Sequence, residues 1–255
     1  MDADLELALG LADAADSLTL PRFRASDLRV ETKPDMSPVT EADKAAEQAM
    51  RTLLAKSRGG DAILGEEFGS RGSASRRWVL DPIDATKNYV RGVPVWGTLI
   101  ALEEGGEVRV GVVSAPALGR RWWAVRGAGA FANGAPIHVS TVRRIEDAHV
   151  LHGGFDGGDP TRWGELLVEI GRQCWRMRGF GDFWQHMLVA EGAAEAALDP
   201  VVNEWDLAAV QVIVEEAGGR FSDFGGARRL DGGTGLSSNG SLHEAIAAVL
   251  GRDLD

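Results

Sequence analysis

Two aspartates follow an apolar, strand-like segment in the stretch WVLDPIDATKNYV, residues 78–90. They are Asp81 and Asp84, three positions apart, with Pro82 between them. At an effective dielectric constant near 20, two like charges about 4 Å apart cost on the order of 4 kcal/mol. A cation between the two carboxylates would offset this repulsion. The spacing therefore indicates a metal site at the end of a strand.

Further acidic residues also lie at the ends of predicted elements. Glu66 and Glu67 follow a short strand-like segment. Asp43 and Asp206 each lie in the first turn of a predicted helix. Together with Asp81, these carboxylates would form the all-oxygen ligand set that Mg²⁺ prefers, completed by water and substrate oxygens. Two metal ions that share Asp81 would activate a water on one side and stabilise a leaving oxygen on the other, which predicts phosphoryl transfer to water.

The residues after the first aspartate of this stretch favour the same chemistry. Pro82 fixes the backbone and lacks an N–H, so the chain can turn there, aim the carbonyl of Ile83 at a metal and bring Asp84 to the same centre. The amides of Ala85 and Thr86 open the next helical turn, and N–H groups at a helix start bind phosphate oxygens. We therefore expect a phosphate to lie beside the metals.

Hydrophobic periodicity predicts the elements that position these acids. Apolar residues recur at helical spacing over residues 3–20 and again over residues 40–58. Residues 95–139 alternate as an antiparallel meander of strands, and helices and strands alternate after it. We predict two coupled halves with the site at their junction: residues 1–150 carry the GEE and DPIDAT motifs, and residues 151–255 carry the WD motif and the residues that select the substrate.

Composition excludes several classes of partner. With 27 Lys and Arg against 38 Asp and Glu, the net charge is −11, which argues against a general nucleic-acid binder. Cys174 is the only cysteine, so no intrachain disulfide forms and a reducing compartment is expected. The sequence shows neither a basic signal segment nor about 18 consecutive apolar residues, so we expect a cytoplasmic protein with no membrane partner.

Three motifs resemble those of a known family. They are GEE at 65–67, WVLDPIDATKN at 78–88 and WDLAAVQVIVEEAGG at 205–219, and together they resemble the motifs of the inositol monophosphatase-like family of Mg²⁺-dependent phosphatases. The resemblance covers nearly the whole chain. It implies an α+β fold of five alternating layers, αβαβα, with an antiparallel N-terminal sheet and a smaller, mixed α/β C-terminal half. It also implies two or three Mg²⁺ ions per subunit and a homodimer.

The resemblance assigns roles to individual positions. The implied metal ligands are Glu66, Asp81 and the Ile83 carbonyl for the first ion, and Asp81, Asp84 and Asp206 for the second. Glu67 matches a further acid near the metals, linked through Glu66 with a weaker third ion. Thr86 matches the hydroxyl that orients the nucleophilic water, with Asp43 as its hydrogen-bond partner. Lys33 falls in a mobile loop that closes over the site.

Several of these residues also have ordinary structural interpretations. Asp43 is well placed to form a capping box with Thr40, and Asp206 suits a helix N-terminus electrostatically. Glu66 and Glu67 taken alone would be a solvated loop pair. The motif match favours a role in the site for all four acids: Glu66 and Asp206 as metal ligands, Glu67 beside the metals and Asp43 as the partner of Thr86.

Ala85 departs from the family, which has glycine at this position. If the position required a positive φ, alanine would cost roughly 1–2 kcal/mol and shift the phosphate-binding amides. We expect ordinary right-handed helical backbone instead, because Ala85 leads directly into a helical turn.

Within the family, several segments resemble most the histidinol-phosphatase branch of actinobacteria, which implies L-histidinol phosphate as substrate and a role in histidine biosynthesis. Histidinol carries an ammonium and an imidazole, so its site should offer carboxylates away from the metals. We expect Asp182 and Asp199 to contact these groups, Trp184 or Phe183 to shape the pocket, and Arg178 to orient Asp182.

Alternatives remain open at this point. Asp182 could instead cap the following helix. Of the five histidines, only His186 is expected near the site. A broad inositol or sugar monophosphatase of the same fold would share every metal motif, and Ala85 leaves room for a non-catalytic relative that binds a metal or a phosphorylated ligand.

Overall fold

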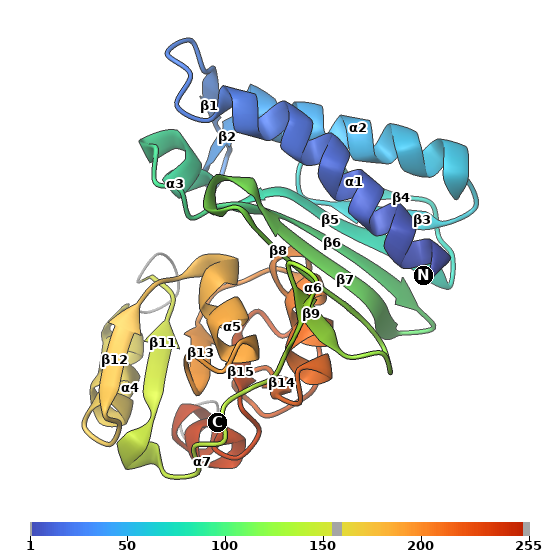
Figure 1. The fold of residues 1–255 in the computed structure, drawn as a ribbon. Coiled ribbons are helices and arrows are strands. Elements are labelled where there is room, and N and C mark those ends of the chain that lie inside the picture. The colour runs from blue at the N-terminus through green and yellow to red at the C-terminus, as the bar shows by residue number, and fades with distance from the viewer. Residues whose placement is uncertain (1, 155–159, 252–255) are drawn as a thin grey trace.

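Two β-sheets alternate with three layers of helices (Figure 1). The computed structural model describes residues 2–154 and 160–251. Helices α1 (Ala3–Thr19) and α2 (Glu41–Ser57) form the first layer, α5 (Asp182–Ala190) and α6 (Glu204–Glu216) the third, and α4 (Pro160–Gly171) and α7 (His243–Leu250) the fifth. The predicted α+β fold with αβαβα layers is confirmed. Among the described residues, no helix is both long and apolar enough to cross a membrane.

The larger sheet forms the second layer and is mainly antiparallel. Its strands, in spatial order, are β10 (Ala135–Ile137), β9 (Ala130–Ala132), β8 (Arg120–Val125), β7 (Glu107–Ala115), β6 (Gly97–Glu104), β5 (Arg76–Asp84), β3 (Ala62–Gly65) and β4 (Gly69–Arg71). Strands β3 and β5 are parallel, whereas β5 to β10 pair antiparallel in chain order. The predicted meander is therefore present.

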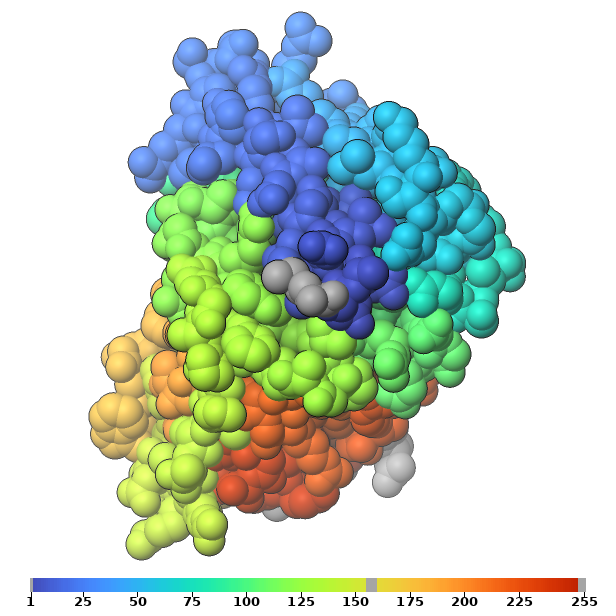
Figure 2. All heavy atoms as spheres, turned by 45° about the vertical axis from the view of Figure 1, so that its right-hand side comes forward, coloured from blue at the N-terminus to red at the C-terminus, as the bar shows by residue number. Residues whose placement is uncertain are grey.

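The smaller sheet forms the fourth layer and is mixed. Its strands, in spatial order, are β12 (Arg176–Gly179), β11 (His149–His152), β13 (Ala196–Asp199), β15 (Gly235–Ser238) and β14 (Arg220–Ser222). The remaining elements are the hairpin of β1 (Val30–Thr32) and β2 (Pro38–Thr40), the short helix α3 (Thr86–Arg91), and three 3₁₀ turns at Leu20–Arg22, Pro116–Leu118 and Ile145–Asp147. Figure 2 shows the N-terminal helices (blue) at the top of the molecule and the C-terminal elements (orange and red) at the bottom.

Both faces of the larger sheet are buried, which explains its nearly continuous apolar strands. On β5, Trp78 and Leu80 pack toward α1 and α2, while Val79 between them packs toward α5 and α6. Helix α6 lies between the two sheets, and its residues 207–214 are all buried. A helix that is enclosed in this way is apolar around most of its circumference. The site acids therefore lie at the ends of elements that the core holds firmly.

A β-bulge at the end of β5 aligns the two aspartates. Asp81 pairs with Leu99 and Asp84 pairs with Gly97, so three steps along β5 match two steps along β6. In a regular strand, residues three apart point to opposite faces of the sheet. The extra residue in the bulge reverses this, so both carboxylates point to the same side. Thr98 stabilises the bulge by donating a hydrogen bond to the Pro82 carbonyl at 2.8 Å.

The expectation for Ala85 is wrong. Its backbone is left-handed, with φ 65° and ψ 45°, because the chain reverses between β5 and α3 at this residue. The same conformation lets the Ala85 amide donate to Oδ1 of Asp84 at 2.9 Å. A left-handed conformation costs a non-glycine residue roughly 1–2 kcal/mol. Alanine therefore carries strain here that glycine would not.

Replacing Ala85 with glycine should stabilise the protein. Relief of the strain outweighs the extra freedom that glycine gives the unfolded chain, so we expect a net gain of about 1 kcal/mol in the free energy of unfolding. Denaturant unfolding of Ala85→Gly measures it. The matched control is Ala45→Gly, at an exposed position in the second turn of α2, which should lose about 1 kcal/mol. Equal losses in the free energy of unfolding of Ala85→Gly and Ala45→Gly would contradict the left-handed backbone assigned to Ala85.

Candidate active site

A cavity of about 540 Å³ opens where the ends of β5, α5, α6 and β13 meet. Its size is typical of a site for a small molecule. Its acidic lining includes Glu66, Asp81, Asp84, Asp182, Asp199 and Asp206. Carboxylates from both sheets and from two helices therefore converge on one space, and this concentration of negative charge favours a cationic occupant.

Asp81, Asp84 and Asp206 form the centre of this acidic cluster. One carboxylate oxygen of each lies within 4.8 Å of the others. Asp81 is 1% exposed, and its Oδ1 has no hydrogen-bond partner within the described part of the chain. A buried, unpaired carboxylate oxygen is costly unless a cation binds it. The donor set therefore fits a hard divalent cation such as Mg²⁺.

Backbone amides hold the other two carboxylates of the cluster. Asp84 accepts hydrogen bonds from the amide of Phe183 at 2.7 Å and, through its other oxygen, from that of Ala85 at 2.9 Å. Asp206 accepts one from the amide of Asn203 at 2.7 Å, which completes a capping box at the start of α6. Asp206 is thus a helix cap and also a candidate ligand, so the two interpretations of this residue are compatible.

The acids of the cluster resist ionisation. Burial raises the pKa of Asp81 well above its usual value, and the charges of Glu66, Asp84 and Asp206 raise it further. Burial also raises the pKa of Asp84, with Asp182 and Asp206 adding to the shift. Asp206 reaches a pKa of about 7, again mainly through burial. Shifts of this kind are expected where a site is built to bind a cation.

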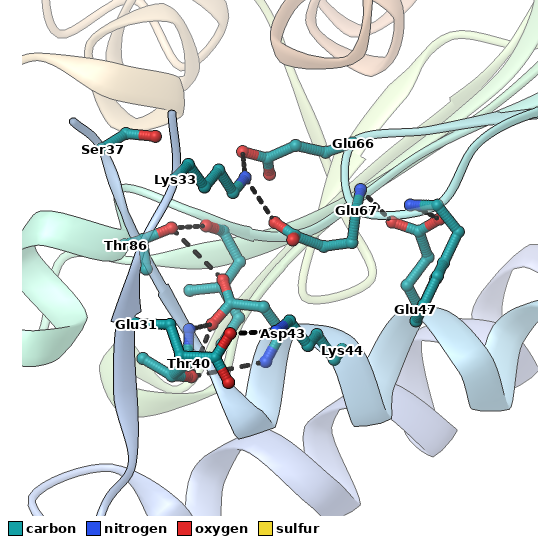
Figure 3. Close-up of polar contacts among 12 residues, drawn as sticks. Glu31, Lys33, Ser37, Thr40, Asp43, Lys44, Glu47, Glu66, Glu67 and Thr86 are labelled. Carbon is teal, nitrogen blue, oxygen red and sulfur yellow. Dashed lines mark hydrogen bonds and ion pairs between the residues drawn. The ribbon is translucent and has the colours of Figure 1, made fainter. Parts of the chain in front are cut away.

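Glu66 and Glu67 lie on the loop after β3 and face the β1–β2 hairpin (Figure 3). Nζ of Lys33, which follows β1, lies 2.7 Å from Oε1 of Glu66 and 2.6 Å from Oε1 of Glu67. Burial raises the pKa of Glu67 to about 7, although Lys33 opposes the shift. The lysine thus neutralises part of the charge of this acidic pair.

Thr86 and Asp43 come together as the family resemblance implied (Figure 3). Oγ1 of Thr86 lies 3.3 Å from Oδ1 of Asp43 and 2.9 Å from the carbonyl oxygen of Ile83. Asp43 also forms the predicted capping box with Thr40, whose amide donates to it at 2.8 Å. Burial raises the pKa of Asp43 to about 6.

Two further carboxylates line the cavity on the side of the smaller sheet. Asp199, at the end of β13, lies 2.6 Å from Nε2 of His186, whose Nδ1 lies 2.8 Å from Oγ of Ser237. His186 lines the cavity, as expected, but so does His152, which was not expected near the site. Asp182 adopts a positive φ of 53° at the start of α5, and Nδ2 of Asn88 donates to it at 3.3 Å. The N-cap of α5 is Gly181 rather than Asp182, so the simple capping interpretation does not apply.

Two of the residues expected to contact the substrate lie elsewhere. Arg178 donates to the carbonyl of Met177 at 2.9 Å on the outer strand β12, and within residues 2–154 and 160–251 no ion pair joins it to Asp182. The expected orienting role of Arg178 therefore has no supporting contact. Trp184 lies outside the cavity and packs on Phe180, with ring centroids 5.0 Å apart, whereas Phe183, the other residue expected to shape the pocket, lines the cavity together with Phe180.

Several supporting residues were not predicted from the sequence. Asn88 contacts Asp182 and Ser237 contacts His186, while Glu47 and Arg51 contact the loop that carries Glu66 and Glu67. For Glu47 and Arg51 the sequence does contain a signal. Asp43, Glu47 and Arg51 are each four residues apart, so they share one face of α2, and that face is buried.

Comparisons with known proteins agree with this architecture. The model of the inositol monophosphatase family matches residues 1–253. A histidinol-phosphatase of Streptomyces coelicolor is 50% identical over 97% of this chain and 96% of its own length, and one of Mycobacterium tuberculosis is 50% identical over 97% of both chains. The solved structure of the extragenic suppressor protein suhB from Bartonella henselae superposes with a TM-score of 0.92 at 27% identity, over 99% of this chain and all of the other. The chain belongs to the inositol monophosphatase family.

Proposed function

We propose that this protein is a Mg²⁺-dependent phosphomonoesterase that hydrolyses L-histidinol phosphate to L-histidinol and phosphate. The observation that carries the proposal is the cluster of Asp81, Asp84 and Asp206, open to a cavity that Asp182 and Asp199 also line. The two relatives at 50% identity, both named histidinol-phosphatases, support the choice of substrate.

The family is metal-dependent, generally with Mg²⁺. We propose two or three ions per subunit, held by Glu66, Asp81, the Ile83 carbonyl, Asp84 and Asp206. When bound, Mg²⁺ supplies a water of lowered pKa and offsets the charge of the leaving oxygen.

The residues around the acidic cluster would position the water and its proton. Thr86 can donate its hydroxyl hydrogen to Asp43 and accept a hydrogen bond from the attacking water through the same oxygen. Asp43 thereby fixes the direction of the hydroxyl. Glu67, which pairs with Lys33 and adjoins the proposed ligand Glu66, would take part in the proton transfer beside the metals. These roles stay predictions.

The phosphate would lie at the start of α3, as predicted for the amides of Ala85 and Thr86. The Ala85 amide already donates to Asp84, so we assign the larger share of phosphate contact to the Thr86 amide. Asp182 and Asp199, which line the same cavity, would attract the ammonium or imidazole of histidinol. The bound metal ions would hold the phosphate end, so the two ends of the substrate would be told apart by charge.

The remaining sequence expectations stay predictions. We propose that the halves 1–150 and 151–255 act as one unit around the site, that the protein is a cytoplasmic homodimer, and that the Lys33 loop closes over the substrate. The single cysteine, Cys174, agrees with a reducing compartment.

A panel of phosphate esters tests the proposed activity. With Mg²⁺ present, phosphate release should be fastest from histidinol phosphate, because only histidinol brings a cation to Asp182 and Asp199. Release should be at least about tenfold slower from inositol 1-phosphate, fructose 1,6-bisphosphate and 3′-phosphoadenosine 5′-phosphate. Comparable rates on inositol 1-phosphate would favour a broad monophosphatase. Release from none of the four would favour a non-catalytic relative, which the strained Ala85 would explain.

Asp182→Asn tests the proposed contact between Asp182 and the cationic groups of histidinol. Asparagine tolerates the left-handed backbone of this position, whereas alanine would add strain of its own. Loss of a charged hydrogen bond worth about 1.5–3 kcal/mol should lower kcat/KM for histidinol phosphate roughly 10- to 100-fold. Hydrolysis of p-nitrophenyl phosphate, which has no cation, serves as the control and should change little. An unchanged kcat/KM for histidinol phosphate would remove Asp182 from the recognition site.

A further inference from the structure

A buried ion pair lies beneath the loop that carries Glu66 and Glu67. Glu47 and Arg51 are one turn apart on α2, and Nε of Arg51 lies 2.7 Å from Oε1 of Glu47. The Glu47 side chain is fully buried and the Arg51 side chain is 9% exposed. Glu47 lies behind Glu67, on the side away from Lys33 (Figure 3).

This pair fixes the backbone of the loop. Glu47 accepts hydrogen bonds from the amides of Glu67 at 2.7 Å and Phe68 at 3.2 Å. Arg51 donates to the carbonyl of Gly69. The loop is also held on its other side, where the Glu66 amide donates to the Leu80 carbonyl at 3.1 Å. Four consecutive residues, 66–69, from the loop to the first residue of β4, therefore each have a backbone group in a hydrogen bond.

The close approach of Glu47 also explains the glycine of the GEE motif. A Cβ at Gly65 would lie 2.1 Å from Oε1 of Glu47 and 2.8 Å from the guanidinium of Arg51. Only glycine leaves room for the ion pair at this distance. Gly65 and the Glu47–Arg51 pair therefore form one structural unit.

We propose that Glu47 and Arg51 are positioning residues for metal binding, which hold the Glu66 and Glu67 carboxylates toward the acidic cluster. The inference rests on the proposed metal site. Without such an anchor, mutual repulsion would move the two glutamates away from Asp81, and the ligand set would have to be assembled at each binding event. An ion pair buried this deeply contributes little net stability compared with apolar residues, so a role in geometry accounts for it better.

Glu47→Gln tests the proposal with little change of shape. Glutamine keeps one acceptor oxygen, but its NH₂ group faces a loop amide that is itself a donor, so one loop contact is lost. Residues that support metal ligands typically affect metal affinity 10- to 100-fold. We expect the Mg²⁺ dissociation constant of metal-free protein, measured by calorimetry, to rise at least tenfold. The Mg²⁺ concentration for half-maximal activity should rise in parallel, with KM for substrate unchanged at saturating Mg²⁺.

Glu216→Gln is the matched control. Glu216 also accepts two loop amides, those of Gly127 and Gly129, both at 2.9 Å, beside a guanidinium, that of Arg126. It does not line the cavity. Both variants should lose thermal stability, but Glu216→Gln should bind Mg²⁺ within twofold of the wild type.

Each outcome bears on a distinct claim. A folded Glu47→Gln variant with wild-type Mg²⁺ affinity overturns the inference alone. If the wild type binds no Mg²⁺, both the proposed function and the inference are wrong. If Glu47→Gln does not fold, Arg51→Lys decides, because one ammonium keeps the charge but cannot reach both Glu47 and the Gly69 carbonyl. A weaker Mg²⁺ affinity in Arg51→Lys supports the inference, and wild-type affinity overturns it.

Discussion

Repulsion between buried carboxylates is the constraint on which the rest of this structure depends. Asp81, Asp84 and Asp206 place oxygens within 4.8 Å of one another, and Glu66 lines the same cavity. Burial strengthens their mutual repulsion and raises their pKa values. A chain free to relax would separate these groups. The fold must therefore hold them in place until a cation compensates their charge.

Each carboxylate is held in place by a different local structural feature on a rigid element of the fold. A β-bulge turns Asp81 and Asp84 to one side of β5, and the amide of Phe183, from the next helical layer, fixes Asp84. A capping box holds Asp206 at the start of α6, which is enclosed between the two sheets. The five layers thus bring distant segments to one cavity, and the surrounding core opposes the repulsion.

Much of the site was predictable from the sequence because its acids are marked by their positions at element ends. The DPID spacing, the capping pattern at Thr40 and the position of Asp206 in the first turn of a helix are local signals, and the motif resemblance joined them into one site. The backbone of Ala85 was predicted wrongly because a helical turn after it does not reveal the αL residue that joins strand to helix. Arg178 was misplaced because the direction of a side chain at an outer strand depends on tertiary packing, and the same dependence decides that Phe183 rather than Trp184 lines the cavity.

Calorimetric titration of metal-free protein with Mg²⁺, in buffers of different ionisation enthalpy, tests most directly whether these acids are held together to bind divalent cations. The pKa of Asp206 is raised from 3.8 to about 7. Its protonated form therefore adds to the free energy of unfolding, in full below pH 3.8, and this contribution is lost as the pH rises through about 7. Mg²⁺ must displace that proton. We predict Mg²⁺ binding with proton release at pH 6.5, and a smaller release at pH 8.5, where Asp206 has already lost its proton. Absence of Mg²⁺ binding, or equal proton release at the two pH values, would contradict it.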